Sequence, residues 1–162
     1  MRAAFVLFLA LFVAGCGASS KADRPSVVAG FYPLAWAAER IVGPGVDVVN
    51  LTPAGAEPHD LELTPSDVEA IDHARLVLYL GNGFQPAVEK AVEDRSGPSL
   101  DLLGGQQLAP GAGEQQGELD PHIWLDPVRF ARIVVAIGAA LHREPAAEAV
   151  AGRLRRLDME YR

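Results

Sequence analysis

The chain has 162 residues, which is enough for one domain, and it carries a formal net charge of −7 with 22% charged and 49% hydrophobic residues. This is the composition of a globular protein, and the absence of a basic patch that would neutralise phosphates argues against a nucleic-acid partner. Twelve prolines and sixteen glycines favour a loop-rich α/β domain over a helical bundle.

The first sixteen residues are typical of an export signal. Arg2 supplies a positive charge, and the apolar run at 3–12 is too short to span a bilayer. Cys16, the single cysteine, follows small and apolar residues, as in a bacterial lipobox. We expect a signal peptide at 1–15, lipidation of Cys16 and a lipidated tether at 16–26, which would anchor the protein on the extracytoplasmic side of the membrane, at the cell surface or in the periplasm. The alternative is an ordinary signal peptide with a chance cysteine.

Apolar patterns from residue 27 onward alternate between strands and helices. The residues of 76–80 are apolar throughout, as expected of a strand buried on both faces of a sheet. The alternation predicts βαβ units and a mostly parallel sheet. Strands are predicted at 27–30, 46–51, 76–80 and, as a possible fourth, 99–103; helices are predicted at 33–42, 65–73 and 84–93 and from 127 onward, with 52–60 and 104–119 as loops.

Two helix starts carry clear capping signals. Thr64 precedes Pro65 with Asp67 in the first turn, and Asp126 precedes Pro127. A side-chain oxygen at the cap and a proline at the first helical position are favourable at a helix N-terminus.

The last segment, 145–162, is predicted to be a helix with an apolar stripe. No glycine ends this helix, and no further element follows it in the sequence. The apolar stripe needs another part of a protein to cover it. We therefore expect that the chain ends within a helix and that a second lobe is missing. The stripe consists of Val150, Leu154, Leu157 and Tyr161.

Two of the four histidines have the setting of a metal ligand. His59 and His122 each follow a proline, lie near carboxylates and come after a predicted strand, so both should emerge at the carboxyl edge of the sheet. Neutral imidazole is the commonest ligand for transition metals. The acids nearby could orient the rings or ligate directly, and each histidine taken alone could be a surface loop residue. His73 and His142 are interpreted as capping or surface residues at helix ends.

The sequence does not favour an enzyme. No Ser/His/Asp arrangement, phosphate-binding loop or His-Glu-x-x-His helix stands out, and a hydrolytic zinc site usually has three protein ligands. Trp36 and Trp124 are interpreted as packing residues.

Several motifs resemble the solute-binding lipoproteins of zinc and manganese ABC importers. The resemblance extends from Val27 to the end of the chain, and its two histidine motifs are the most specific part. The motifs are Phe31-Tyr32-Pro33-Leu34, Glu57-Pro58-His59-Asp60 with the following Leu-Glu-Leu-Thr-Pro-Ser-Asp, Leu80-Gly81-Asn82-Gly83, and Asp120-Pro121-His122-Ile123-Trp124-Leu125-Asp126-Pro127.

The resemblance implies two α/β lobes joined by a long helix, with a divalent metal ion bound between the lobes. Residues 27–143 would then be the N-terminal lobe, which supplies His59 and His122, and 144–162 would be the start of the linking helix. The remaining ligands would lie in the absent lobe. The protein would act as a monomer that delivers zinc, favoured over manganese, to a membrane permease. A surface adhesin, a nonfunctional fragment and, last, a metal-dependent hydrolase are the alternatives.

Overall fold

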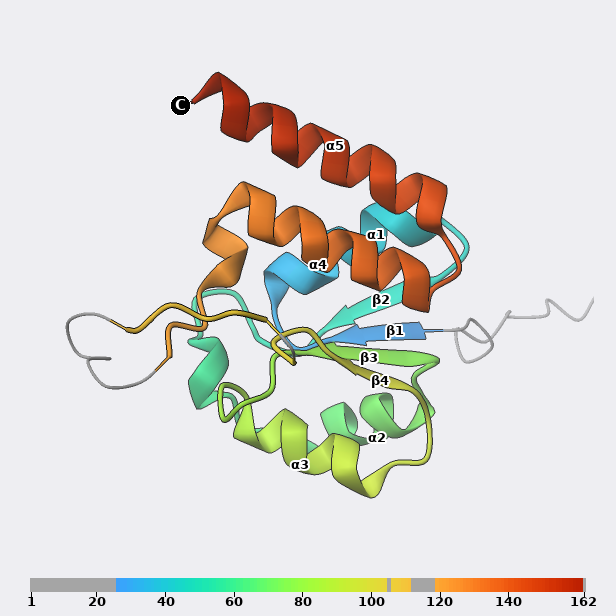
Figure 1. Cartoon of the computed structure of the whole chain (residues 1–162). Coiled ribbons are helices and arrows are strands. Elements are labelled where there is room, and N and C mark those ends of the chain that lie inside the picture. Colours follow the sequence, from blue (N-terminus) through green and yellow to red (C-terminus); the bar gives the residue numbers. More distant parts are fainter. Residues whose placement is uncertain (1–25, 105, 112–118, 162) are drawn as a thin grey trace, which may run out of the picture.

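The computed structural model describes residues 26–104, 106–111 and 119–161. The predicted signal peptide, Cys16 and almost all of the tether lie outside these residues. One parallel sheet forms the centre of the molecule, with the strand order β2-β1-β3-β4 (Figure 1). The predicted parallel α/β fold is confirmed. The strands are β1 (Ser26–Ala29), β2 (Asp47–Asn50), β3 (Leu76–Tyr79) and β4 (Ser99–Asp101).

Helices cover both faces of the sheet. In Figure 1, α1, α4 and α5 lie above the sheet, and α2 and α3 lie below it. Two single turns of 3-10 helix, η2 and η4, lie in the connecting segments. The bounds are α1 (Tyr32–Val42), η2 (Pro58–Asp60), α2 (Pro65–His73), α3 (Pro86–Asp94), η4 (Ile123–Leu125), α4 (Pro127–Ala140) and α5 (Glu144–Glu160).

Two predicted boundaries are wrong for local reasons. The helix predicted from residue 84 begins at Pro86, because Gln85 before it has φ −127° and ψ 68°, outside the helical region. The segment at 52–60, predicted as a plain loop, contains η2, whose single turn is too short to produce a helical period in the sequence.

The predicted caps are present. Thr64 and Asp67 form a capping box, in which each side chain accepts a hydrogen bond from the other residue's backbone N–H. Asp126 accepts from Val128 N at 2.8 Å and from Arg129 N at 3.0 Å at the start of α4. The helices that lead away from the two predicted histidine segments therefore start at fixed residues.

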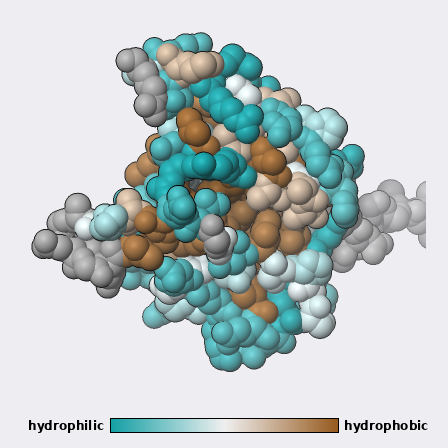
Figure 2. All heavy atoms as spheres, in the orientation of Figure 1, coloured by the Kyte–Doolittle hydropathy of each residue, from teal (hydrophilic) through white to brown (hydrophobic). Residues whose placement is uncertain are grey.

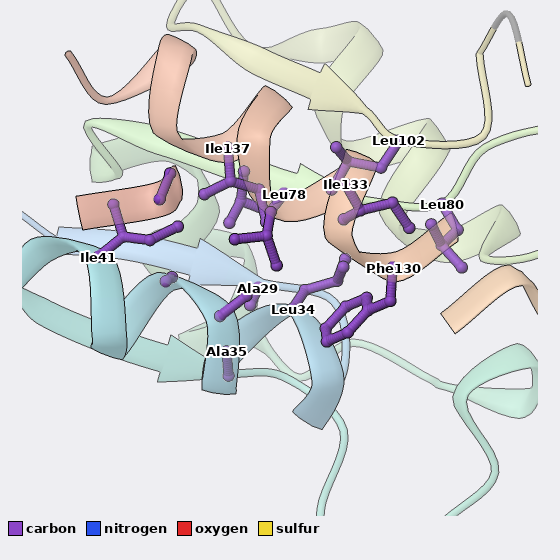
Figure 3. Close-up of a cluster of buried hydrophobic side chains, with 14 of the residues drawn as sticks. Ala29, Leu34, Ala35, Ile41, Leu78, Leu80, Leu102, Phe130, Ile133 and Ile137 are labelled. Atoms are coloured by element: carbon purple, nitrogen blue, oxygen red, sulfur yellow. The ribbon is translucent and has the colours of Figure 1, made fainter. Parts of the chain in front are cut away.

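The strand β3 separates two hydrophobic clusters, as its continuous apolar sequence predicts. Leu76 and Leu78 belong to the larger cluster below α1 and α4, and Val77 belongs to the smaller cluster above α2 and α3. Figure 3 shows side chains of α1 (Leu34, Ala35, Ile41) and of α4 (Phe130, Ile133, Ile137) in one cluster with Leu78 and Leu80. Such burial is the main favourable contribution to folding.

The helix α5 packs mainly on α4, through a close turn between them. His142 has a φ of 54°, and Arg143 N donates to Gly138 O at 2.8 Å, which is the Schellman arrangement at a helix end. The predicted stripe of α5 is covered only in its first half within the described residues. Val150 is buried, whereas Leu157 is 45% and Tyr161 is 87% exposed.

In the space-filling view, apolar side chains gather in the middle of the visible face, below α5 (Figure 2). None of the helices in the described ranges has both the length and the apolar character needed to cross a bilayer.

Candidate metal site

Each of the four strands is followed by a segment that carries an aromatic or imidazole ring to the carboxyl edge of the sheet. Phe31 follows β1, His59 follows β2 on η2, Phe84 follows β3, and His122 lies beyond β4, just before η4. Parallel strands all end at the same edge, and the change of direction between β1 and β3 is the place where open α/β sheets bind ligands. The structure therefore places both predicted histidines at this edge.

One phenylalanine lies against both imidazole rings. The centroid of the Phe84 ring is 6.0 Å from that of His59 and 6.4 Å from that of His122. Trp124 adds contacts at 5.0 Å with His122 and 5.5 Å with Phe84, and Phe31 lies 4.8 Å from Trp124. The two histidines, 63 positions apart in the sequence, thus belong to one cluster of rings.

Asp120 orients the His122 ring. Its Oδ1 atom lies 2.7 Å from Nδ1 of the ring and accepts a hydrogen bond from the backbone N–H of His122 at 2.9 Å. That backbone bond and the side-chain bond lower the pKa of Asp120, so the carboxylate stays ionised. An ionised acceptor places the imidazole proton on Nδ1 and leaves the lone pair of Nε2 free for a metal ion.

His59 is held less firmly than His122. Its ring makes no hydrogen bond with the described residues, and its Nε2 atom lies 3.9 Å from Oδ2 of Asp60, which is beyond hydrogen-bond distance. The side chain of His59 is 49% exposed, against 34% for His122. Its ring nitrogens are therefore accessible to an incoming ion.

The four carboxylates near the histidines have different roles. Asp120 orients a ring, and Asp126 caps α4. Asp60 is 79% exposed beside His59, and Glu57 provides the backbone carbonyl that closes η2. Among residues 26–104, 106–111 and 119–161, no three His, Cys, Asp or Glu side chains come together closely enough to hold one metal ion. His59 and His122 are the imidazoles that the described residues place at this edge.

A cavity of about 500 Å³ opens beside His59 and Phe84. Its other lining residues come from the turn after β3 and from the segments on either side of the stretch at 112–118, which lies outside the described residues. The lining also includes Asn82, Gly83, Leu103, Leu119 and Pro121.

His59 and His122 are candidate ligands on the sequence alone, whereas Phe84, whose ring lies near both imidazoles, is not among the predicted site residues. A signal existed, since Phe84 follows a Gly-Asn-Gly turn directly after a buried strand and so must lie at the same edge as the histidines. The prediction that Trp124 is a packing residue is consistent with its contacts to Phe31 and Phe84. Likewise, His73 caps its own helix, with Nδ1 lying 2.9 Å from Glu69 O.

Comparison with known proteins gives one consistent family. The model of the family described as zinc-uptake complex component A, periplasmic (ZnuA) matches residues 27–160. The high-affinity zinc uptake system protein ZnuA of Bacillus subtilis is 32% identical over 155 residues, which cover 83% of this chain and 49% of that protein. The manganese-binding lipoprotein MntA of Halalkalibacterium halodurans is 31% identical over 144 residues, which cover 82% of this chain and 45% of that protein.

A solved structure supports the same assignment. The crystal structure of the Zn(II)-bound ZnuA-like domain of Streptococcus pneumoniae AdcA matches with a TM-score of 0.70 and 28% identity, over 85% of this chain and 54% of that one. The chain therefore spans about half the length of the relatives that it matches.

Proposed function

Because the chain belongs to the ZnuA-like family of solute-binding lipoproteins of zinc and manganese ABC importers, a family of transport proteins and not of enzymes, we propose that it captures a divalent transition metal outside the cytoplasm for delivery to a membrane permease. The observation that carries the proposal is the convergence of His59 and His122 on Phe84 at the carboxyl edge of the sheet. His59 and His122 are the proposed ligands.

Zinc is the proposed cargo in preference to manganese. The donors available at the edge are imidazole nitrogens, and zinc suits nitrogen-rich sites, whereas manganese prefers oxygen ligands. Two imidazoles fill half of a tetrahedral shell, so further ligands must come from water or from another part of the protein. We propose that residues 27–143 act as one lobe of the site and that 144–162 lead towards a second lobe.

Asp120→Ala is expected to lower the zinc affinity by about 10- to 100-fold, because loss of the residue that orients a ligand usually costs that much. Asp60→Ala is the matched control, since it removes the same charge beside the other histidine from a side chain that is 79% exposed. It should have a much smaller effect. Calorimetric titration at one fixed pH measures these affinities. Both variants and the wild type are titrated with zinc and with manganese.

The result of that titration also tests the proposed function. The wild type should bind zinc more tightly than manganese. No saturable heat from either metal with the wild type would refute metal capture by this chain, and a larger loss in Asp60→Ala would mean that Asp60 is itself a ligand.

The proposed location is the extracytoplasmic face of the membrane, with a lipid on Cys16. Relatives are named lipoproteins, and Cys16 follows an apolar run with a positive start. Cys16→Ser should move the protein from the membrane fraction to the soluble fraction of bacteria that express the whole chain, because each buried CH₂ of a lipid contributes about 0.8 kcal/mol to membrane binding. Equal partition of both forms in a detergent phase separation would exclude the anchor.

A further inference from the structure

The turn between β3 and α3 carries Phe84, whose ring lies near both imidazoles. Phe84 lies within 6.4 Å, centroid to centroid, of rings from each of the other three strand-end segments. Its own side chain is buried, with 8% exposure. By contrast, the two imidazoles are partly open to solvent, and the described residues give the His59 ring no hydrogen bond. The Phe84 ring, with its centroid 6.0 Å from that of His59, is a neighbour that can restrain the His59 ring.

The backbone that carries Phe84 is fixed by buried polar contacts on both sides. Gln85 is 1% exposed, and its Oε1 atom accepts a hydrogen bond from Leu80 N at 3.2 Å. The amide group of Gln85 also lies against Gly30, where a Cβ atom would overlap it. This contact ties the turn to the end of β1, the strand next to β3.

Carboxylates hold the same turn from the other side. Glu89 accepts hydrogen bonds from Gly83 N and from Gln85 N, both at 3.2 Å. Asp101, at the end of β4, accepts from Gly81 N at 2.8 Å. The turn is thus connected to β1, β4 and α3, and these contacts hold the backbone on either side of Phe84.

We propose that Phe84 is a positioning residue of the metal site, which sets the distance and the angle between the His59 and His122 rings before a metal ion arrives. This inference rests on the proposed function, because positioning matters only if the two rings ligate one ion. A ligand that is already in place loses less conformational freedom on binding.

The alternative is that Phe84 only fills the core. Phe130 separates the two possibilities, because it is buried to the same degree, at 7% exposure, and belongs to the same hydrophobic cluster. Among the described residues its ring lies near Trp36, at 6.0 Å between centroids, and not near an imidazole. Phe84→Leu and Phe130→Leu thus remove similar apolar area, but only the first removes a ring that touches the two histidines.

The experiment compares these two variants with the wild type by titration with Co²⁺, whose absorption spectrum reports ligand geometry, and with Zn²⁺. Phe84→Leu is expected to weaken binding of both ions by about tenfold or more, the usual cost of disturbing a residue that orients ligands, and to change the Co²⁺ spectrum. Phe130→Leu should lower the melting temperature by a similar amount but leave the affinities and the spectrum unchanged. If Phe84→Leu does not fold, Phe84→Met is the second variant, because methionine fills the space without a flat ring.

The outcomes separate this inference from the proposed function. If the wild type binds neither ion, or if His59→Ala binds as well as the wild type, the metal site itself is wrong. If the wild type binds through its histidines and the folded Phe84 variant keeps the same affinity and spectrum, the metal site stands and the positioning role of Phe84 is refuted. Equal loss of affinity in Phe130→Leu would also refute it, because the effect would then follow stability and not ring contact.

Discussion

Replacement of either His59 or His122 by alanine is expected to remove most of the zinc binding of this chain. Structural zinc sites with four ligands contribute about 10–16 kcal/mol, so one ligand accounts for about 3 kcal/mol, which is on the order of a hundredfold in affinity. Because two protein nitrogens are available at the sheet edge, each contributes a large share of the free energy of zinc binding. The double variant should lose the binding that either single variant retains.

His73→Ala provides the matched control for these variants. His73 lies at the end of α2, on the opposite side of the sheet from α4, and its Nδ1–H donates a hydrogen bond of 2.9 Å to Glu69 O in its own helix. Its replacement should leave the zinc affinity unchanged. Calorimetry at a fixed pH suits the comparison, because imidazole must be neutral to bind a metal ion. Unchanged affinity in both site variants would mean that zinc binds elsewhere on the chain.

The general position of the site could be predicted from the sequence, because it depends on local patterns. The alternation of strands and helices sets the parallel sheet, and the capping signals at Thr64 and Asp126 fix where the helices after the two histidine segments begin. Since all strands of a parallel sheet end at one edge, the segments with His59 and His122, which follow strands, were expected there. No tertiary information was needed for that step.

The detailed arrangement of the site could not be predicted, because it depends on contacts between distant segments. The convergence of Phe31, Phe84 and Trp124 follows from the strand order β2-β1-β3-β4, which periodicity alone does not give. The 3-10 turns at η2 and η4 are too short to produce a period. That Asp120, and not Asp126, holds His122 is a matter of side-chain geometry.

The packing of α5 on α4 is another contact between segments, and it depends on one glycine. Gly138 of α4 is buried against Ala147 of α5, and a Cβ atom at residue 138 would overlap the Cβ atom of Ala147. The carbonyl of Gly138 also accepts the hydrogen bond that closes the turn to α5, so the two helices cannot easily separate to make room. A larger residue at this position must therefore displace α5 or strain the turn.

Gly138→Ala is expected to destabilise the protein, and Gly152→Ala, in α5, is the matched control. Both substitutions gain about 1 kcal/mol of helix propensity, but a Cβ atom at residue 152 has only the end of the Arg156 side chain nearby, at 3.6 Å. The overlap at residue 138 should cost about 1–3 kcal/mol. Denaturant midpoints should thus rise for Gly152→Ala and fall for Gly138→Ala. If both variants were stabilised equally, α5 would be free to shift on α4, and the close turn at His142 would not fix the direction in which this helix leaves the domain.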